Sequence, residues 1–213
     1  MKPEIDYTLY LVTDRELMAC KSIEECVEQA ISGGCTLVQL REKTASSQEF
    51  YQLALRIRDI TSRLNVPLII NDRADIALAV DADGVHIGQD DLPYDAARRI
   101  LGQKKIVGVS ASNLEEALAA ADMGADYIGV GAMFATGTKT DANLTGIDEL
   151  KRIRAQVNIP IVVIGGINKD TIPRFRGTGI DGIAVVSAIV SQKNIAEAAQ
   201  ELKSLFLDVP GKK

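Results

Sequence analysis

The chain has 213 residues, of which 46% are hydrophobic and 25% charged, which is an ordinary composition for one globular domain. Its formal net charge is −5, and Lys and Arg form no basic block, so the sequence lacks the electrostatic signature of a nucleic-acid-binding protein. We therefore expect a single domain over residues 1–213 with no nucleic-acid partner.

The sequence also argues against a secreted or membrane protein. The N-terminal segment has acidic residues where a signal peptide needs a basic start, and no apolar run approaches the roughly 20 residues of a transmembrane helix. Cys20, Cys26 and Cys35 have neither disulfide-framework nor zinc-site spacing, which predicts small buried side chains in a reducing compartment. We expect a cytoplasmic protein with no membrane partner. The oligomeric state stays open, a homo-oligomer included.

Eight short segments rich in β-branched residues recur along the chain and are expected to be strands. They are residues 7–14, 36–42, 67–72, 83–88, 105–110, 126–132, 160–166 and 182–188. Most are almost continuously apolar, which is typical of parallel strands that are buried on both faces.

Helical patterns with polar caps lie between these segments, at residues 22–34, 46–65, 112–124 and 194–206. In the first of them, Ser22 followed by Glu25 predicts a capping box. Strands that alternate with helices over about 200 residues predict an α/β fold, a single (β/α)8 TIM barrel. A doubly wound open sheet is the alternative, but no GxGxxG turn follows the first strand.

In a parallel barrel, the polar residues that carry chemistry collect where the strands end. Read in chain order, the expected strand ends carry Asp14, Arg41, Glu42, Lys43, Asn71, Asp72, Gln89, Asp90, Asp91, Ser110, Thr136, Thr138, Lys139, Gly165, Gly166, Val186 and Ser187. Arg and Lys neutralise phosphoryl oxygens, and carboxylates such as Asp72 and Asp91 are ligands that Mg²⁺ prefers. Backbone N–H groups near Gly166 and Ser187 suit a phosphate. The pattern indicates a pyrophosphate with a metal ion on one side and a monophosphate on the other.

Each of these features also has a simpler explanation. Residues 41–43 alone could be a solvated strand end, and Asn71 with Asp72 could cap the following helix. Asp90 and Asp91 could interact with the dipole of the next helix, and the glycines after the seventh strand could form only a tight turn. For His86, inside an apolar strand, a structural role is favoured over catalysis. For the simpler view to hold, all of these explanations would have to apply at once on one face of a barrel, and this is much less probable than each alone.

The segments YLVTD, VQLREK, IINDR, GVHIGQDD, GVSAS, YIGVGAMFATGTK, VVIGGI and GIAVVSAI resemble, in this order and spacing, the thiamin phosphate synthases. The resemblance covers roughly residues 7–190, and QLREK with NDR and GQDD is its most specific part. It implies a (β/α)8-barrel transferase of thiamine biosynthesis. Such an enzyme joins 4-amino-2-methyl-5-hydroxymethylpyrimidine pyrophosphate to 4-methyl-5-(2-phosphooxyethyl)thiazole and releases pyrophosphate, with one Mg²⁺ ion per active site.

The resemblance also implies roles for particular residues. The pyrimidine pyrophosphate would be held by Gln39, Leu40, Arg41, Glu42, Lys43 and Asn71, with Ser110 and Lys139 completing the pyrophosphate site. Asp72 and Asp91 would bind Mg²⁺. The thiazole phosphate would be held by Thr136, Gly137, Thr138, Gly166, Val186 and Ser187. The family commonly has a proline between the two threonines, where this chain has Gly137; this departure leaves the hydroxyls and Lys139 in place.

No Ser-His or Cys-His arrangement is evident, so the sequence predicts catalysis by charge stabilisation, with Arg41, Lys43, Ser110 and Lys139 acting on the leaving pyrophosphate. The pyrimidine CH₂–O bond would break before the thiazole nitrogen attacks. Two rivals stay open: a thiazole tautomerase-like barrel and a non-catalytic thiamin phosphate-binding barrel. Neither has an evident need for the whole set of pyrophosphate-binding and metal-binding residues.

Overall fold

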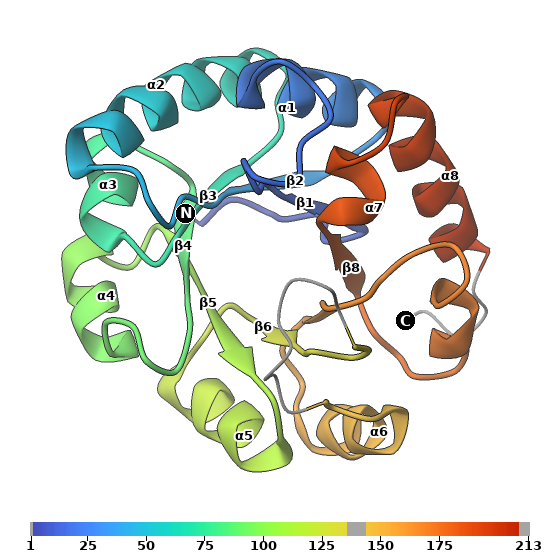
Figure 1. Ribbon diagram of the computed structural model, residues 1–213. Helices are drawn as coiled ribbons and strands as arrows, with labels where there is room; N and C mark the ends of the chain where they lie inside the picture. Colours follow the sequence, from blue (N-terminus) through green and yellow to red (C-terminus); the bar gives the residue numbers. More distant parts are fainter. Residues whose placement is uncertain (1, 136–143, 209–213) are drawn as a thin grey trace.

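The computed structural model describes residues 2–135 and 144–208, and these form a (β/α)8 barrel. Figure 1 shows the strands as an inner ring with the helices around it. The strands pair in the order β1-β2-β3-β4-β5-β6-β7-β8, all parallel, and β1 closes the barrel by pairing with β8. The predicted fold class is confirmed, and the open doubly wound alternative is excluded.

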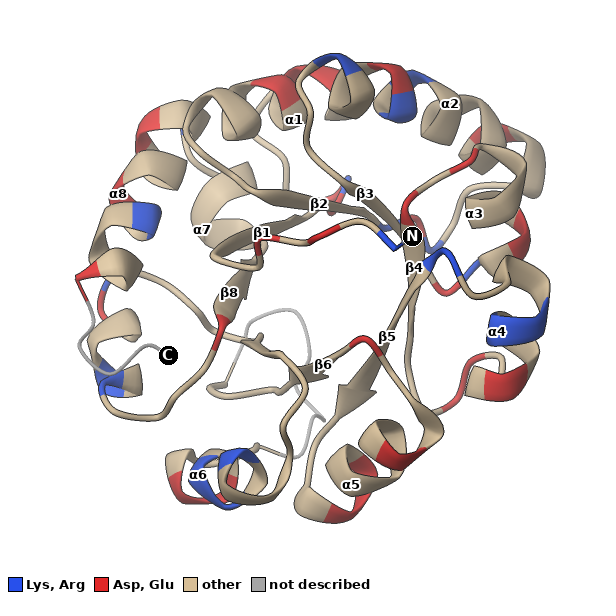
Figure 2. Ribbon diagram, turned by 180° about the vertical axis from the view of Figure 1, so that it is seen from behind, with Lys and Arg blue, Asp and Glu red and all other residues tan. Residues whose placement is uncertain are grey.

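The strands are short and buried. They are β1 (Leu9–Val12), β2 (Leu37–Leu40), β3 (Leu68–Asn71), β4 (Gly84–Ile87), β5 (Ile106–Ala111), β6 (Tyr127–Val130), β7 (Ile161–Val163) and β8 (Gly182–Val185). None of these eight strands contains Asp, Glu, Lys or Arg, and Figure 2 shows the charged residues on the helices and at the ends of the strands. Seven of the strands lie within an expected segment, and the residues after their carboxyl ends belong to the rim; β5 extends one residue beyond its expected segment, to Ala111.

The helices cover the outside of the barrel. They are α1 (Ile23–Ser32), α2 (Ser47–Arg63), α3 (Ala74–Ala79), α4 (Tyr94–Leu101), α5 (Leu114–Met123), α6 (Ile147–Gln156), the 3₁₀ helix η1 (Ile172–Phe175), α7 (Ser187–Val190) and α8 (Ile195–Leu207). The four helices expected from the polar caps all form.

The predicted capping box at the start of α1 is only half present. The Ser22 side chain accepts from the backbone N–H of Glu25, but the Glu25 carboxylate accepts from the backbone N–H of Lys21 rather than that of Ser22. The backbone before α1 places the N–H of Lys21 3.4 Å from a carboxylate oxygen of Glu25. The full reciprocal box lies at Ser46 and Glu49, which begin α2.

The interior of the barrel is an aliphatic cluster with two buried tyrosines, Tyr10 and Tyr127. Ile5 and Tyr7, from the segment before β1, pack against this cluster at the amino end of the barrel. The carbonyl oxygen of Tyr7 lies 1.8 Å from the position that a Cβ would take at Gly182, so only glycine allows this approach. The N-terminal segment therefore closes one end of the barrel, and the other end is left for chemistry.

A repeated contact joins the strands in pairs at the amino end. The residue immediately before each of three even-numbered strands, β4, β6 and β8, is an aspartate whose carboxylate accepts from a backbone N–H at the start of the preceding strand. These contacts are Leu68 N to Asp83, Val107 N to Asp126 and Ile161 N to Asp181, each at 2.8 Å. Before β2 the equivalent residue is Thr36, whose hydroxyl accepts from Leu9 N at 3.1 Å. Within the continuous closed sheet, we call each strand pair linked in this way (β1–β2, β3–β4, β5–β6 and β7–β8) a two-strand unit.

Each of the three aspartates also pairs with an arginine from the helix that precedes the first strand of its unit. The pairs are Arg58–Asp83 (2.7 Å), Arg98–Asp126 (2.7 Å) and Arg154–Asp181 (3.1 Å). These side chains are largely buried, so each charge is held by a partner and by backbone hydrogen bonds. The three pairs tie α2, α4 and α6 to the end of the barrel opposite the strands' carboxyl termini.

The three cysteines are free thiols. Cys26 and Cys35 are buried as expected, whereas Cys20 is only half-buried, in the loop before α1. Burial raises the pKa of Cys35 to about 12, so its thiol stays protonated at neutral pH.

Candidate active site

The carboxyl ends of β1 to β5 place most of the predicted site residues on one rim of the barrel. Hydrogen bonds and ion pairs link side chains from successive strand ends: Arg41 to Asp14, Lys43 to Asp72, and His86 to Ser110. Because parallel neighbouring strands end at the same edge, residues far apart in the sequence meet here.

Arg41 is held by the end of β1. Its backbone N–H donates to the Thr13 hydroxyl at 3.0 Å, and its guanidinium lies 3.0 Å from a carboxylate oxygen of Asp14. The Arg41 side chain is partly exposed, so part of the guanidinium faces solvent at the rim. The arginine is pre-oriented but can still meet a ligand.

Glu42 points away from solvent. Its side chain is 2% exposed and forms a two-point ion pair with Arg15, with contacts of 3.0 and 3.3 Å. Each of the three charged side chains of residues 41–43 has an opposite charge beside it, and only Lys43 of the three is exposed, so solvation alone does not explain this segment. The carboxylate of Glu42 anchors the loop after β1.

Asp72 lies in a strained position at the end of β3. Its backbone φ is 63°, in the left-handed region that non-glycine residues seldom adopt, and its N–H donates to the carbonyl of His86 at 2.8 Å. The Lys43 ammonium is 2.5 Å from its carboxylate. Burial raises the pKa of Asp72, and the nearby Asp91 raises it further, although Lys43 acts in the opposite direction.

Asp91 completes a pair of carboxylates with Asp72. One of its oxygens accepts from the backbone N–H of Gly88 at 2.7 Å, which sets its orientation. Two carboxylates this close repel each other, and a bound cation would relieve both that repulsion and the cost of burial. No cluster of three or more His, Cys, Asp or Glu side chains occurs within residues 2–135 and 144–208, so any metal site here would have few protein ligands. That donor set fits Mg²⁺, which usually keeps several waters and binds through one or two carboxylates alongside substrate phosphates.

The simpler explanations for these aspartates are wrong. The residue that caps α3 is Arg73, with no side-chain cap, so neither Asn71 nor Asp72 serves as its N-cap. The cap of α4 is Pro93, and the acidic residue of its first turn is Asp95 rather than Asp90 or Asp91. Helix capping does not account for the residue types at these two strand ends.

Asn71 carries an unsatisfied donor. The residue is 8% exposed, and its amide nitrogen is buried with no hydrogen-bond partner among the described residues. Leaving such a group unpaired costs about 1–3 kcal/mol, so an acceptor is expected to complete it. Asn71 is paired in register with His86, which puts this open donor at the rim beside Asp72.

Ser110 is supported from below by a polar network inside the barrel. His86 Nε2 lies 2.9 Å from the Ser110 hydroxyl, and His86 Nδ1 lies 2.9 Å from the hydroxyl of Tyr127. Tyr127 contacts the Tyr10 hydroxyl at 2.9 Å, and Gln39 donates its amide N–H to Tyr10 at 2.8 Å. His86 keeps some accessible surface but is closely surrounded by protein, and this burial lowers its pKa to about 4, so the ring is neutral.

The sequence predictions missed this network and the Arg15–Glu42 pair. A tyrosine within a buried strand, such as Tyr10 or Tyr127, is a usable signal, because its hydroxyl needs a partner inside the core. No pattern in the chain indicates Arg15, since its partner is 27 residues away.

The other side of the rim is described in part. The predicted residues Thr136, Gly137, Thr138 and Lys139 lie outside the described residues. Gly166 follows β7 with φ 67°, and a Cβ there would lie 2.7 Å from that of Phe134. Val186 and Ser187 follow the adjacent strand β8, and Ser187 begins α7. Of the residues predicted for the monophosphate, Gly166, Val186 and Ser187 thus follow two neighbouring strands.

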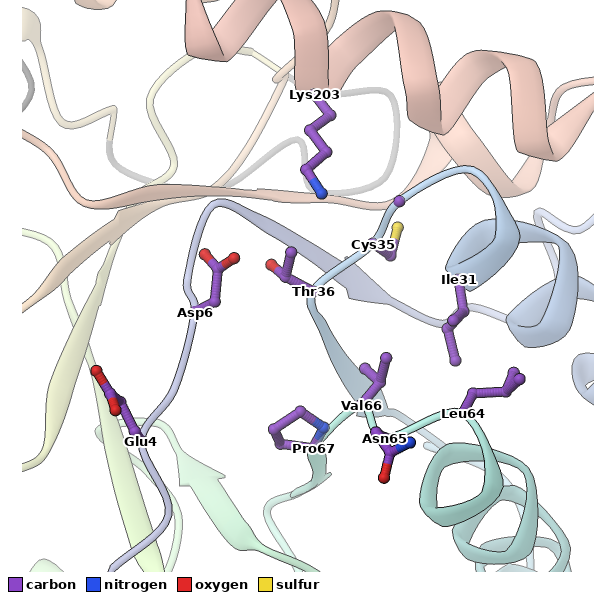
Figure 3. Close-up of a pocket in the computed structure, with 11 residues that line it drawn as sticks. Glu4, Asp6, Ile31, Cys35, Thr36, Leu64, Asn65, Val66, Pro67 and Lys203 are labelled. Atoms are coloured by element: carbon purple, nitrogen blue, oxygen red, sulfur yellow. The ribbon is translucent and has the colours of Figure 1, made fainter.

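A pocket of about 400 Å³ lies at the opposite end of the barrel, where β1, β2 and β3 begin. Figure 3 shows Lys203 of α8 pointing toward Asp6 and Thr36 across this pocket. It contains none of the predicted site residues, and its polar groups come from the N-terminal segment, the segments that precede these strands and α8.

Fold and rim together define a class of protein: a (β/α)8-barrel enzyme with its polar side chains gathered at the carboxyl ends of the strands. The family described as "Thiamine monophosphate synthase" matches residues 9–189. The chain belongs to the thiamine monophosphate synthase family, and it is therefore a transferase.

Named relatives agree with this over the full length. The chain is 59% identical to a thiamine-phosphate synthase of Clostridium beijerinckii over 98% of this chain and 100% of the relative. It is 61% identical to that of Ruminiclostridium cellulolyticum over 98% and 99%. A solved thiamine phosphate pyrophosphorylase of Pyrococcus furiosus superposes with a TM-score of 0.89 at 41% identity, covering 97% of this chain and 98% of that one. Within the described part of the chain, no helix is both long and apolar enough to cross a membrane.

Proposed function

We propose that the protein condenses 4-amino-2-methyl-5-hydroxymethylpyrimidine pyrophosphate with 4-methyl-5-(2-phosphooxyethyl)thiazole to give thiamin phosphate and pyrophosphate, in the cytoplasm, as a single domain of residues 1–213. The observation that carries this proposal is the Asp72–Asp91 carboxylate pair beside Lys43 and Arg41, with the open amide donor of Asn71 next to it. The carboxylates can bind a cation, and the basic side chains and the amide can bind an anion next to it on the same rim.

Asp72 and Asp91 would hold one Mg²⁺ ion, which neutralises charge on the pyrophosphate when bound. Arg41 and Lys43 would contact the same phosphoryl oxygens, because an arginine fork and a lysine ammonium are the usual partners of such groups. Lys43 and Arg41 now pair with Asp72 and Asp14, so ligand binding would exchange these ion pairs for contacts with phosphate.

The reaction needs no protein nucleophile. The CH₂–O bond of the pyrimidine substrate would break with its electron pair leaving on the pyrophosphate oxygen, and the amino group of the ring would delocalise the positive charge. The lone pair of the thiazole nitrogen would then form the new C–N bond. The two substrates would be positioned around this carbon by the other predicted site residues. These are Gln39, Leu40, Glu42, Asn71, Ser110, Thr136, Gly137, Thr138, Lys139, Gly166, Val186 and Ser187.

A turnover assay tests the proposal. The protein is incubated with both substrates and Mg²⁺, and any thiamin phosphate is oxidised to its fluorescent product. We expect fluorescence that EDTA abolishes and added Mg²⁺ restores. Binding of both phosphorylated molecules without product would instead favour a thiamin phosphate-binding barrel. Conversion of a thiazole tautomer without condensation would favour a tautomerase.

A further inference from the structure

A chain of four hydrogen bonds crosses the interior of the barrel and joins two residues of the rim. It runs from Gln39 of β2 through Tyr10 of β1, Tyr127 of β6 and His86 of β4 to Ser110 of β5. Each link is between 2.8 and 2.9 Å, and Gln39, Tyr10 and Tyr127 are buried. We name this set the relay.

The direction of the relay follows from counting protons. Gln39 Nε2 donates to the Tyr10 hydroxyl, so the single proton of Tyr10 must go elsewhere. The one remaining polar neighbour of that hydroxyl among the described residues is Tyr127. Tyr127 then accepts from Tyr10 and has its own proton to give to His86 Nδ1.

The tautomer of the histidine follows from the same count. The neutral ring has one donor and one acceptor nitrogen. Because Nδ1 accepts from Tyr127, the proton of the ring lies on Nε2, which donates to the Ser110 hydroxyl. The Ser110 oxygen is then an acceptor inside the relay, and its own proton is left for the rim.

We propose that His86, Tyr127 and Tyr10 are positioning residues that orient the two ends of the relay. At one end they fix Ser110 as a hydrogen-bond donor toward an anion. At the other end they fix the side-chain carbonyl oxygen of Gln39 toward the rim as an acceptor. The identity of the ligand rests on the proposed function: a substrate that carries both an amino group and a pyrophosphate matches an acceptor at Gln39 and a donor at Ser110.

The relay also implies a specificity. A ligand with an oxo group in place of the amino group would require the Gln39 amide to turn and present its NH₂. The turned amide would accept from Tyr10, every hydrogen bond of the relay would reverse, and the Ser110 proton would point to His86 instead of the anion. The two ends of the relay are thus coupled. Gln39 accepts from an amino group in the same arrangement in which Ser110 donates to a phosphate oxygen.

The single histidine of the chain makes the first test direct. In tag-free protein labelled with ¹⁵N-histidine, we expect the ring of His86 to be the Nε2–H tautomer without any substrate. In Gln39→Glu at alkaline pH, the introduced carboxylate can only accept, so we expect a switch to the Nδ1–H tautomer. In Tyr10→Phe/Gln39→Glu the link is cut, and the switch should be lost.

Several outcomes would overturn the proposal: an Nδ1–H tautomer in the unaltered protein, no switch in Gln39→Glu, or a switch that persists when Tyr10 is replaced. If Gln39→Glu does not fold, Tyr127→Phe serves instead, because Nδ1 loses its partner. A mixture of tautomers is then expected, and one unchanged tautomer would contradict the relay.

A second test measures binding of inorganic pyrophosphate with Mg²⁺ by calorimetry. We expect Ser110→Ala to weaken binding about tenfold, as for the loss of one hydrogen bond to a charged group. Tyr10→Phe should weaken it about threefold in the unaltered background and have no effect in Ser110→Ala. Equal losses in both backgrounds would assign Tyr10 a merely structural role. Neither measurement requires turnover, so failure of the relay and failure of the synthase assay are distinguishable.

Discussion

Asp91 and the adjacent Asp90 are the same residue type in different surroundings. Asp91 is half-buried, oriented by Gly88 and paired with Asp72, whereas Asp90 beside it is exposed. The two therefore form a matched pair for mutation.

We expect Asp91→Ala to lower the rate of condensation by at least tenfold, because removal of one preorganised charge contact typically costs about 10²–10³ in turnover. Steady-state kinetics over a range of Mg²⁺ concentrations measures this, and circular dichroism checks folding. Asp90→Ala is the control and should behave as the unaltered protein. Equal rates for all three proteins would remove Asp91 from the metal site.

Ser187 begins α7 at the end of β8, in the region proposed for the thiazole phosphate. We expect Ser187→Ala to raise the KM for the thiazole phosphate about tenfold, as for the loss of one hydrogen bond to a charged group, with kcat little changed. The KM for the pyrimidine pyrophosphate should stay constant. A thiazole KM identical to that of the unaltered protein would place this phosphate elsewhere.

His86 predicts a pH dependence of stability. Burial lowers its pKa to about 4, below the roughly 6.5 of an unfolded chain. The unfolded state therefore takes up a proton as pH falls through 6.5 while the folded state does not. The resulting stability is fully present above pH 6.5 and is lost toward pH 4, by about 1.4 kcal/mol per pH unit. Urea unfolding between pH 6.5 and 5 measures this slope. The variant His86→Gln removes the only histidine of the chain, so its stability should not show this contribution to the slope.

At the scale of the element, each two-strand unit carries a recurring contact that we expect to stabilise the barrel. In each of three units an aspartate before the even-numbered strand accepts from a backbone N–H at the start of the preceding strand and pairs with an arginine from the helix before that strand. The same contacts hold each unit's strand pair in register. The recurrence of an aspartate just before three strands was visible in the sequence, but the arginine partners lie 25 to 28 residues away and could not be read from it.

We expect Asp126→Ala to destabilise the protein by about 3 kcal/mol, because breaking a buried ion pair leaves the Arg98 charge uncompensated. Chemical denaturation measures the free energy of unfolding. Asp122→Ala, at an exposed position four residues earlier, is the matched control and should change it by less than about 0.5 kcal/mol. A cost no larger than that of the control would mean that the repeated contact does not stabilise the unit.

The predicted site and the contacts that we expect to stabilise the barrel lie at opposite ends of the whole molecule. The N-terminal segment, the three aspartate–arginine pairs and Gly182 lie at the amino end, while the predicted site residues that the structure describes lie toward the carboxyl end. Removal of residues 1–6 should therefore lower the free energy of unfolding while leaving both KM values near those of the full chain at low temperature. Kinetics and denaturation of the same truncated protein measure both, and a large rise in either KM would show that the two ends are coupled.

The sequence by itself determined the order and kind of the elements, since alternation of short apolar runs with capped amphipathic helices is a local property. It also determined which residue types follow the strands, and the predicted site rests on these types. The tertiary structure alone decided which of those residues meet. Glu42 turned inward to Arg15, Asn71 kept an open donor, and Ser110 joined Gln39 through three side chains from other strands. Barrel closure brings β1, β4 and β6 around one interior, and no periodicity along the chain encodes a distance across it.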